Sequence, residues 1–97
     1  MYMVIRRYAM EPSKVDEVIR KVDEQYLEKL RLLPGYEGYY VLDSGEGKIS
    51  SVTLSADKDS SHAATRLSKE WVDNWLKDVH LDLVETIEGP VVVHGGG

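Results

Sequence analysis

Residues 36–56, YEGYYVLDSGEGKISSVTLSA, decide the fold of this chain. Two segments rich in aromatic and β-branched residues, 36–43 and 48–56, flank the triplet Gly45-Glu46-Gly47. Glycine readily adopts the positive φ angles that a tight hairpin turn requires. The sequence therefore predicts an antiparallel β-hairpin near the middle of the chain, with other elements arranged on both sides of it.

A helix is predicted before this hairpin. Apolar residues recur at helical spacing over residues 15–30, and charged residues fill the positions between them. Ser13 is placed to cap the helix, with Asp16 three residues later completing a capping box. The pair Pro34-Gly35 is expected to end the helix directly before the hairpin.

A second helix is predicted after the hairpin. The polar stretch 57–61 is rich in N-cap residues, and the helix is expected to run to about residue 79. Its large apolar residues lie near one face: Ala64, Leu67, Trp71, Trp75 and Val79.

The outermost segments are predicted strands. Residues 2–10, YMVIRRYAM, form the first, and residues 83–87 form the last. Gly89-Pro90 is expected to break the last strand, residues 91–94 to form a short extra strand, and residues 95–97 to form a flexible tail.

The resulting order, β-α-β-β-α-β, predicts an α+β fold with a single domain over residues 1–97. It is typical of a ferredoxin-like sandwich, in which both helices cover one face of a four-stranded antiparallel sheet. The first strand carries apolar residues on both of its faces. Because an apolar sheet face of this size should not stay in water, we expect a second copy to cover it, giving a homodimeric α/β barrel.

Composition excludes several classes of function. The net charge is −5, and acidic and basic residues are mixed along the predicted helices, which argues against a nucleic-acid partner. The longest apolar run is Val91-Val92-Val93, whereas a membrane-spanning helix needs about 20 apolar residues. The three histidines have no metal-ligand spacing, so we expect no metal site. From the short apolar runs we expect no membrane association. There is no cysteine, and we expect a cytoplasmic location.

Several motifs resemble the antibiotic biosynthesis monooxygenase superfamily. They are LPGYEGY at residues 33–39, Ser68-Lys69-Glu70 and Trp75-Leu76-Lys77 in the second helix, and EGPV at residues 88–91. The resemblance covers nearly the whole chain and implies a dimeric α/β barrel. The resemblance implies no single activity, because this superfamily includes cofactor-independent oxygenases, haem-degrading enzymes and proteins without an assigned activity.

The haem-degrading branch of this superfamily uses an asparagine on the first strand, a tryptophan on the second helix and a histidine about ten residues later. Trp75 matches the tryptophan, but the first-strand position falls on Arg6 or Arg7 and the third position is Glu85. Two of the three positions depart from the pattern, so haem degradation is not expected.

Two aromatic groups are candidates for a ligand site. Trp71 and Trp75 are one helical turn apart, and they can form the wall of an apolar pocket or simply pack in the core. The tyrosines of the predicted strands, among them Tyr40, can line an aromatic cavity or form a dimer interface.

Candidates for chemistry are fewer. Arg6 and Arg7 point to opposite faces of the first strand, and whichever is buried can act as an anion clamp or make an ion pair, for example with Glu85. His80 is the one plausible base near the predicted pocket, although a histidine after a helix end is also a common surface residue.

These observations predict a small dimeric α/β-barrel protein without a cofactor, which binds a small aromatic ligand through Trp71, Trp75 and Tyr40. The alternative is a cofactor-independent monooxygenase acting on a quinol or phenolic substrate. In that alternative Arg7 stabilises the substrate anion and His80 is the base.

Overall fold

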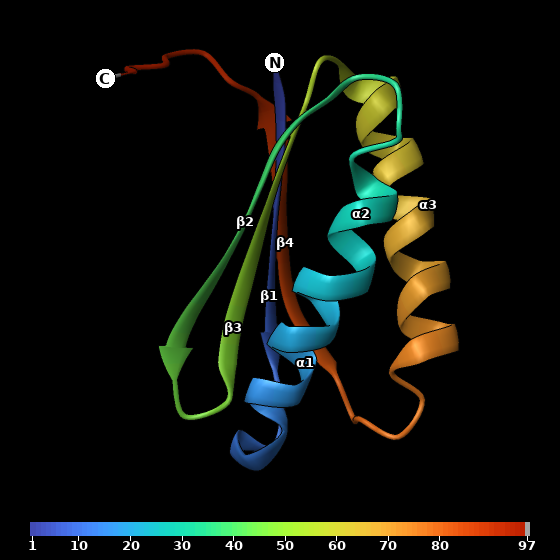
Figure 1. Ribbon diagram of the computed structural model, residues 1–97. Helices are drawn as coiled ribbons and strands as arrows, with labels where there is room; N and C mark the ends of the chain where they lie inside the picture. Colours follow the sequence, from blue (N-terminus) through green and yellow to red (C-terminus); the bar gives the residue numbers. More distant parts are fainter. Residues whose placement is uncertain (97) are drawn as a thin grey trace.

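The computed structural model describes residues 1–96, and its helices cover one face of a four-stranded antiparallel sheet (Figure 1). The strands lie in the order β2-β3-β1-β4, so the first strand is central and pairs with both β3 and β4. The predicted α+β, ferredoxin-like arrangement is confirmed. The elements in chain order are β1 Tyr2–Ala9, a 3-10 turn Pro12–Lys14, α1 Val15–Lys21, a π-helical segment Val22–Tyr26, α2 Leu27–Leu30, β2 Tyr36–Gly45, β3 Lys48–Ser55, α3 Lys58–Trp75 and β4 Asp82–Pro90.

The predicted hairpin joins β2 to β3, and its turn contains three consecutive residues with positive φ. These angles are 90° at Gly45, 57° at Glu46 and 78° at Gly47. The turn also contacts the end of β1, because the Met10 N–H donates to the Gly47 carbonyl at 2.8 Å. A Cβ atom at Gly47 would lie 2.0 Å from the Met10 carbonyl oxygen, so this position requires glycine for space as well as for conformation.

The helical layer before the hairpin is continuous, but it is not a uniform α-helix. It starts with a 3-10 turn, and the π-helical segment Val22–Tyr26 separates α1 from α2. The predicted Ser13–Asp16 capping box is wrong, because the Ser13 hydroxyl donates to the Glu11 carboxylate at 3.0 Å instead of capping the helix. The predicted apolar face is confirmed at its most buried positions, which are Val15, Val18, Tyr26 and Leu30.

Helix α3 begins as expected and ends early. Its N-cap is Asp57, whose carboxylate accepts the Ser60 N–H at 2.8 Å, and this hydrogen bond lowers the pKa of Asp57. The helix ends at Trp75 rather than near residue 79, and Leu76 and Val79 are buried in the segment that follows.

The last strand is longer than predicted. β4 continues through Gly89 to Pro90, so the expected break at these residues is wrong. The short extra strand at residues 91–94 is also wrong: the Val91 N–H donates to the Met1 carbonyl at 2.9 Å, and Val92 and Val93 are exposed. The predicted tail includes Gly97, which lies outside the described residues.

The two faces of the sheet differ in their surroundings. On the face that α1, α2 and α3 cover, alternate residues of β3 are buried, namely Ile49, Ser51, Thr53 and Ser55. The other face is open, and one apolar row crosses all four strands on it: Tyr40, Val52, Ile5 and Ile87. Tyr40 and Ile87 in this row are exposed.

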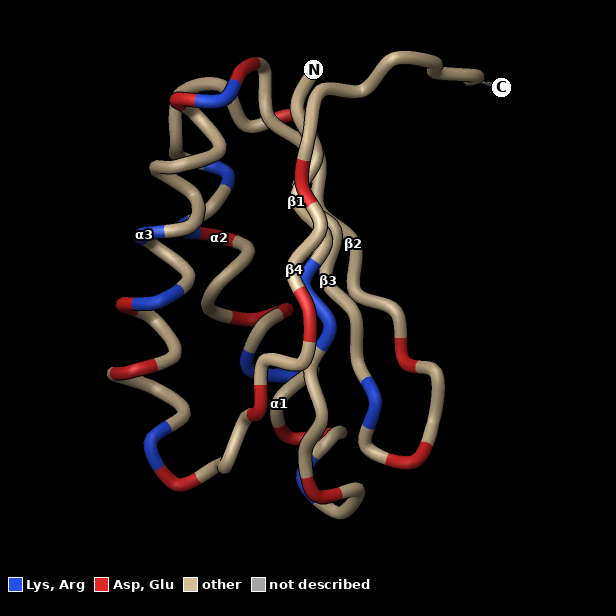
Figure 2. Tube along the Cα trace, turned by 180° about the vertical axis from the view of Figure 1, so that it is seen from behind, with Lys and Arg blue, Asp and Glu red and all other residues tan. Residues whose placement is uncertain are grey.

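The charged residues are interspersed along the helices and strands rather than gathered in one region (Figure 2). Within residues 1–96, no helix is long and apolar enough to cross a membrane.

Candidate functional site

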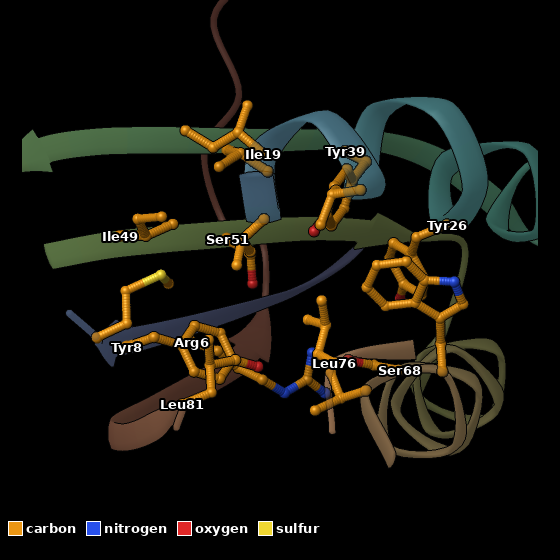
Figure 3. Close-up of a pocket in the computed structure, with 16 residues that line it drawn as sticks. Arg6, Tyr8, Ile19, Tyr26, Tyr39, Ile49, Ser51, Ser68, Leu76 and Leu81 are labelled. Carbon is orange, nitrogen blue, oxygen red and sulfur yellow. The ribbon is translucent and has the colours of Figure 1, made fainter. Parts of the chain in front are cut away.

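A cavity of about 50 Å³ lies between the helices and the covered face of the sheet (Figure 3). Side chains from β1, β2, β3, α1, α3 and the π-helical segment line it, together with three residues between these elements, Met10, Leu76 and Leu81. Most of these side chains are apolar or aromatic. Its polar groups come from two serines, three tyrosines and one arginine, and they are Arg6, Tyr8, Tyr26, Tyr39, Ser51 and Ser68.

Arg6 is the charged residue of this cavity. Its position on β1 faces the helices, and the residue is only 8% exposed. The guanidinium donates a hydrogen bond to the Thr65 hydroxyl of α3, and that hydroxyl donates to the Ser61 carbonyl at 3.1 Å. Within residues 1–96, no carboxylate makes an ion pair with Arg6. The arrangement therefore holds a buried cation at the cavity wall without an anionic partner from the described chain.

Three tyrosines lie around this cation. Burial raises the pKa values of Tyr8, Tyr26 and Tyr39, while the positive charge of Arg6 acts in the opposite direction on all three. Tyr26 packs edge-on against Tyr39 with ring centroids 5.5 Å apart, and tilted against Trp71 at 5.3 Å. The hydroxyls therefore stay neutral at physiological pH and can donate hydrogen bonds to a ligand oxygen.

The two tryptophans are not brought together. Trp71 is 3% exposed and lines the cavity, and its indole N–H has no acceptor among the described residues. Trp75 is 49% exposed and lies outside the cavity lining, with the Lys29 ammonium 5.9 Å from its ring centroid. Leu76, the residue that follows α3, does line the cavity.

Three further candidates from the sequence also lie outside the cavity. Tyr40 is on the open face of the sheet, where it is exposed. Arg7 is exposed and makes an ion pair with Glu85 at 2.9 Å, which was the alternative to its role as an anion clamp. His80 is exposed and lies 2.9 Å from the Asp82 carboxylate. Of the five candidates, the structure places Trp71 alone in the cavity.

Two cavity residues stand directly beside residues that the sequence interpretation chose, and one of them, Arg6, was its open alternative to Arg7 as the buried arginine. Arg6 precedes Arg7, and Tyr39 precedes Tyr40. Strand alternation indicates that one member of each pair is buried, but it does not indicate which one. The polar character of β3 was a usable signal, because Ser51 lies in its buried row and lines the cavity.

A wider groove of about 350 Å³ adjoins the cavity on the side of α1 and β2. Four residues line both spaces and so form the wall between them: Ile19, Val22, Tyr39 and Val41. Val22 opens the π-helical segment, a helix irregularity that often occurs at functional sites. Within residues 1–96 no group of three or more potential ligands is arranged to hold a metal ion.

No model of a known protein family matches the sequence, and no curated protein is significantly similar to it. Solved structures do match. A dimeric ferredoxin-like protein from an uncultured marine organism is 14% identical, with a TM-score of 0.76 and complete coverage of both chains. A protein from Chloroflexus aurantiacus J-10-fl, named for the antibiotic biosynthesis monooxygenases, is 21% identical with a TM-score of 0.71, over 99% of this chain and 98% of that one.

A third match is SnoaB, a cofactor-independent oxygenase from Streptomyces nogalater. It is 11% identical with a TM-score of 0.65, over 96% of this chain and 94% of that one. At these identities the likeness shows the fold. The fold that the resemblance to the antibiotic biosynthesis monooxygenase superfamily implies is thus confirmed.

Proposed function

We propose that this chain forms a homodimer in which each subunit binds a small aromatic ligand between its helices and its sheet. The observation that carries the proposal is the cavity itself, in which aromatic and apolar walls surround a small polar cluster. Apolar walls with a few placed polar groups are the usual composition of a small-molecule site. A cytoplasmic location is part of this proposal.

The size of the cavity implies that the ligand enters by moving its wall. The volume of about 50 Å³ is well below the roughly 150 Å³ that holds benzene in an engineered apolar cavity. The adjoining groove of about 350 Å³ provides the missing room once the side chains of Ile19 and Val22 shift. Both side chains are only partly buried; Ile19 belongs to α1, and Val22 is the first residue of the π-helical segment.

The proposed dimer is supported by the open face of the sheet. The apolar row Tyr40, Val52, Ile5 and Ile87 crosses its full width. Exposed apolar patches of this kind usually mark an interaction surface. A second copy presents the same row, so a dimer with a twofold axis between the two sheets buries both rows.

Calorimetric titration with a panel of small aromatic compounds tests ligand binding. A matched pair of variants locates the site: Ser51→Leu fills the cavity, whereas Ser50→Leu places the same side chain on the other face of β3. We expect the wild type and Ser50→Leu to bind a member of the panel and Ser51→Leu to lose that binding. A wild-type protein that binds none of the panel, or a Ser51→Leu variant that binds as well as the wild type, contradicts the proposal.

The second candidate function is a cofactor-independent monooxygenase acting on a quinol or phenol. The specific observation in its favour is Arg6, a buried cation at the cavity wall that would stabilise a substrate anion. In such a reaction the substrate supplies the electrons, one oxygen atom enters the product and the other leaves as water. Oxygen uptake above background with a quinol or phenol, lost in Arg6→Gln, is the expected result, and background uptake across the panel contradicts it.

A further inference from the structure

The cavity holds a cation that the described chain leaves without a charged partner. Arg6 is more than nine-tenths buried, and its hydrogen bond to Thr65 is the one side-chain hydrogen bond that it makes within residues 1–96. A guanidinium has five N–H donors, so most of its capacity is unused by the described side chains. Burying a charge without a charged partner costs free energy, and an anion bound beside Arg6 would offset that cost.

The surroundings of Arg6 show where that anion would sit. Arg6 lines the cavity together with Ser51, its neighbour across the β1–β3 pairing, and Ser68 of α3 (Figure 3). The three tyrosines nearby supply neutral hydroxyls rather than charges. An anion placed in the cavity would thus meet one positive charge and several neutral donors.

We propose that the ligand of this cavity carries an anionic oxygen, a carboxylate or a phenolate, and that Arg6 binds it. This inference rests on the proposed ligand-binding function and specifies the class of ligand. A single buried cation matches a single negative charge, and the apolar side chains that make up the remaining walls match an uncharged aromatic body.

The test compares acids with their neutral counterparts of the same shape. Benzoate and naphthoate are titrated beside benzyl alcohol and naphthalenemethanol, and an ionised nitrophenol beside nitrobenzene. We expect the wild type to bind the anions about ten- to a hundredfold more tightly, the range that a hydrogen bond to a charged group supplies. The relative preference for carboxylate and phenolate identifies the source of the anionic oxygen.

Variants assign this preference to Arg6. Arg6→Gln keeps a donor for Thr65 and removes the charge, so the affinity for the anions should fall to that of the neutral compounds. Arg66→Gln is the matched control, because Arg66 lies exposed on α3 beside Thr65. Arg6→Lys keeps the charge and should retain part of the preference. Circular dichroism establishes that each variant is folded.

The possible results separate this inference from the function on which it rests. Equal affinity of the wild type for anions and neutral compounds overturns the inference and leaves the ligand site standing. Retained preference in Arg6→Gln overturns the assignment to Arg6. A wild type that binds neither anions nor neutral compounds overturns the ligand site itself. If Arg6→Gln does not fold, the wild-type ratio and Arg6→Lys still decide the question.

Discussion

Thr65 positions the buried guanidinium of Arg6. Its hydroxyl accepts a hydrogen bond from Arg6 and donates one to the Ser61 carbonyl, so it links the charge of β1 to the backbone of α3. We expect Thr65→Val to lower the preference for anions several-fold and to leave the affinity for the neutral alcohols unchanged, since the charge stays but loses its anchor. Paired calorimetric titrations measure the ratio, and an unchanged ratio would show that Thr65 has no positioning role.

Tyr39 makes stability depend on alkaline pH. Burial raises its pKa above the ordinary value of 10.0, so the folded protein retains the phenolic proton that the unfolded chain releases near that pH. The contribution of the neutral Tyr39 phenol to the free energy of unfolding is fully present below pH 10, and it is lost as the pH rises through the folded-state pKa. Tyr39→Phe should therefore flatten the fall in unfolding free energy above pH 10, measured by urea denaturation.

Equal slopes in the wild type and Tyr39→Phe would show that the Tyr39 proton does not contribute. Tyr8 and Tyr26, whose pKa values are raised by the same cause, keep part of the slope in Tyr39→Phe.

At the scale of single residues, the sequence predicts the alternation of side chains but not its direction. Arg6 and Arg7 show why. Both faces of β1 carry apolar residues, so nothing in the strand itself indicates which face the helices cover. The answer depends on tertiary packing of α1, α2 and α3, which local patterns do not contain.

The hairpin turn offers a test at the scale of an element. Gly45 and Gly47 both have positive φ, but a Cβ atom at Gly45 meets nothing within 4 Å, whereas one at Gly47 collides with the Met10 carbonyl. We expect both alanine variants to be destabilised by backbone strain and Gly47→Ala to lose a further 1–3 kcal/mol or so, the usual cost of overpacking. Denaturant titration compares them, and equal losses would mean that the turn moves away from β1 at no cost.

The helices show which element features the sequence can predict. The 3.6-residue spacing identified the buried positions Val15, Val18, Tyr26 and Leu30, because burial of an apolar face drives that pattern. It did not reveal the π-helical segment Val22–Tyr26 or the end of α3 at Trp75. Both depend on how the helices fit against the sheet.

At the scale of the molecule, the proposed dimer depends on the open face of the sheet. Ile87 is half exposed in the apolar row that crosses this face, so Ile87→Lys would bury a charge in a twofold interface. We expect sedimentation to show a dimer for the wild type and a folded monomer for Ile87→Lys. Leu32→Lys is the control, since Leu32 is 82% exposed and lies between α2 and β2, outside the strands; this variant should stay dimeric. A monomeric wild type would contradict the dimer.

The chain order of helices and strands and the pairing of β2 with β3 were predictable because hairpin, helix and strand signals agree along the chain. The candidate site was not predictable to the same degree. A cavity is what remains after many side chains have packed, and its lining comes from segments as distant as Arg6 and Leu81. The sequence thus indicates an aromatic interior, and the structure selects which aromatic and charged residues face it.

Trp71 and Trp75 are two tryptophans in different environments. Trp71 is enclosed, whereas half of Trp75 is in water, so their fluorescence should separate into a blue and a red component. Dissolved iodide collides with Trp75 and not with Trp71, and only Trp71 lies where a bound molecule would arrive. Trp75→Phe should therefore leave a single tryptophan, Trp71 at the cavity wall, whose fluorescence lifetime reports whether that space is filled.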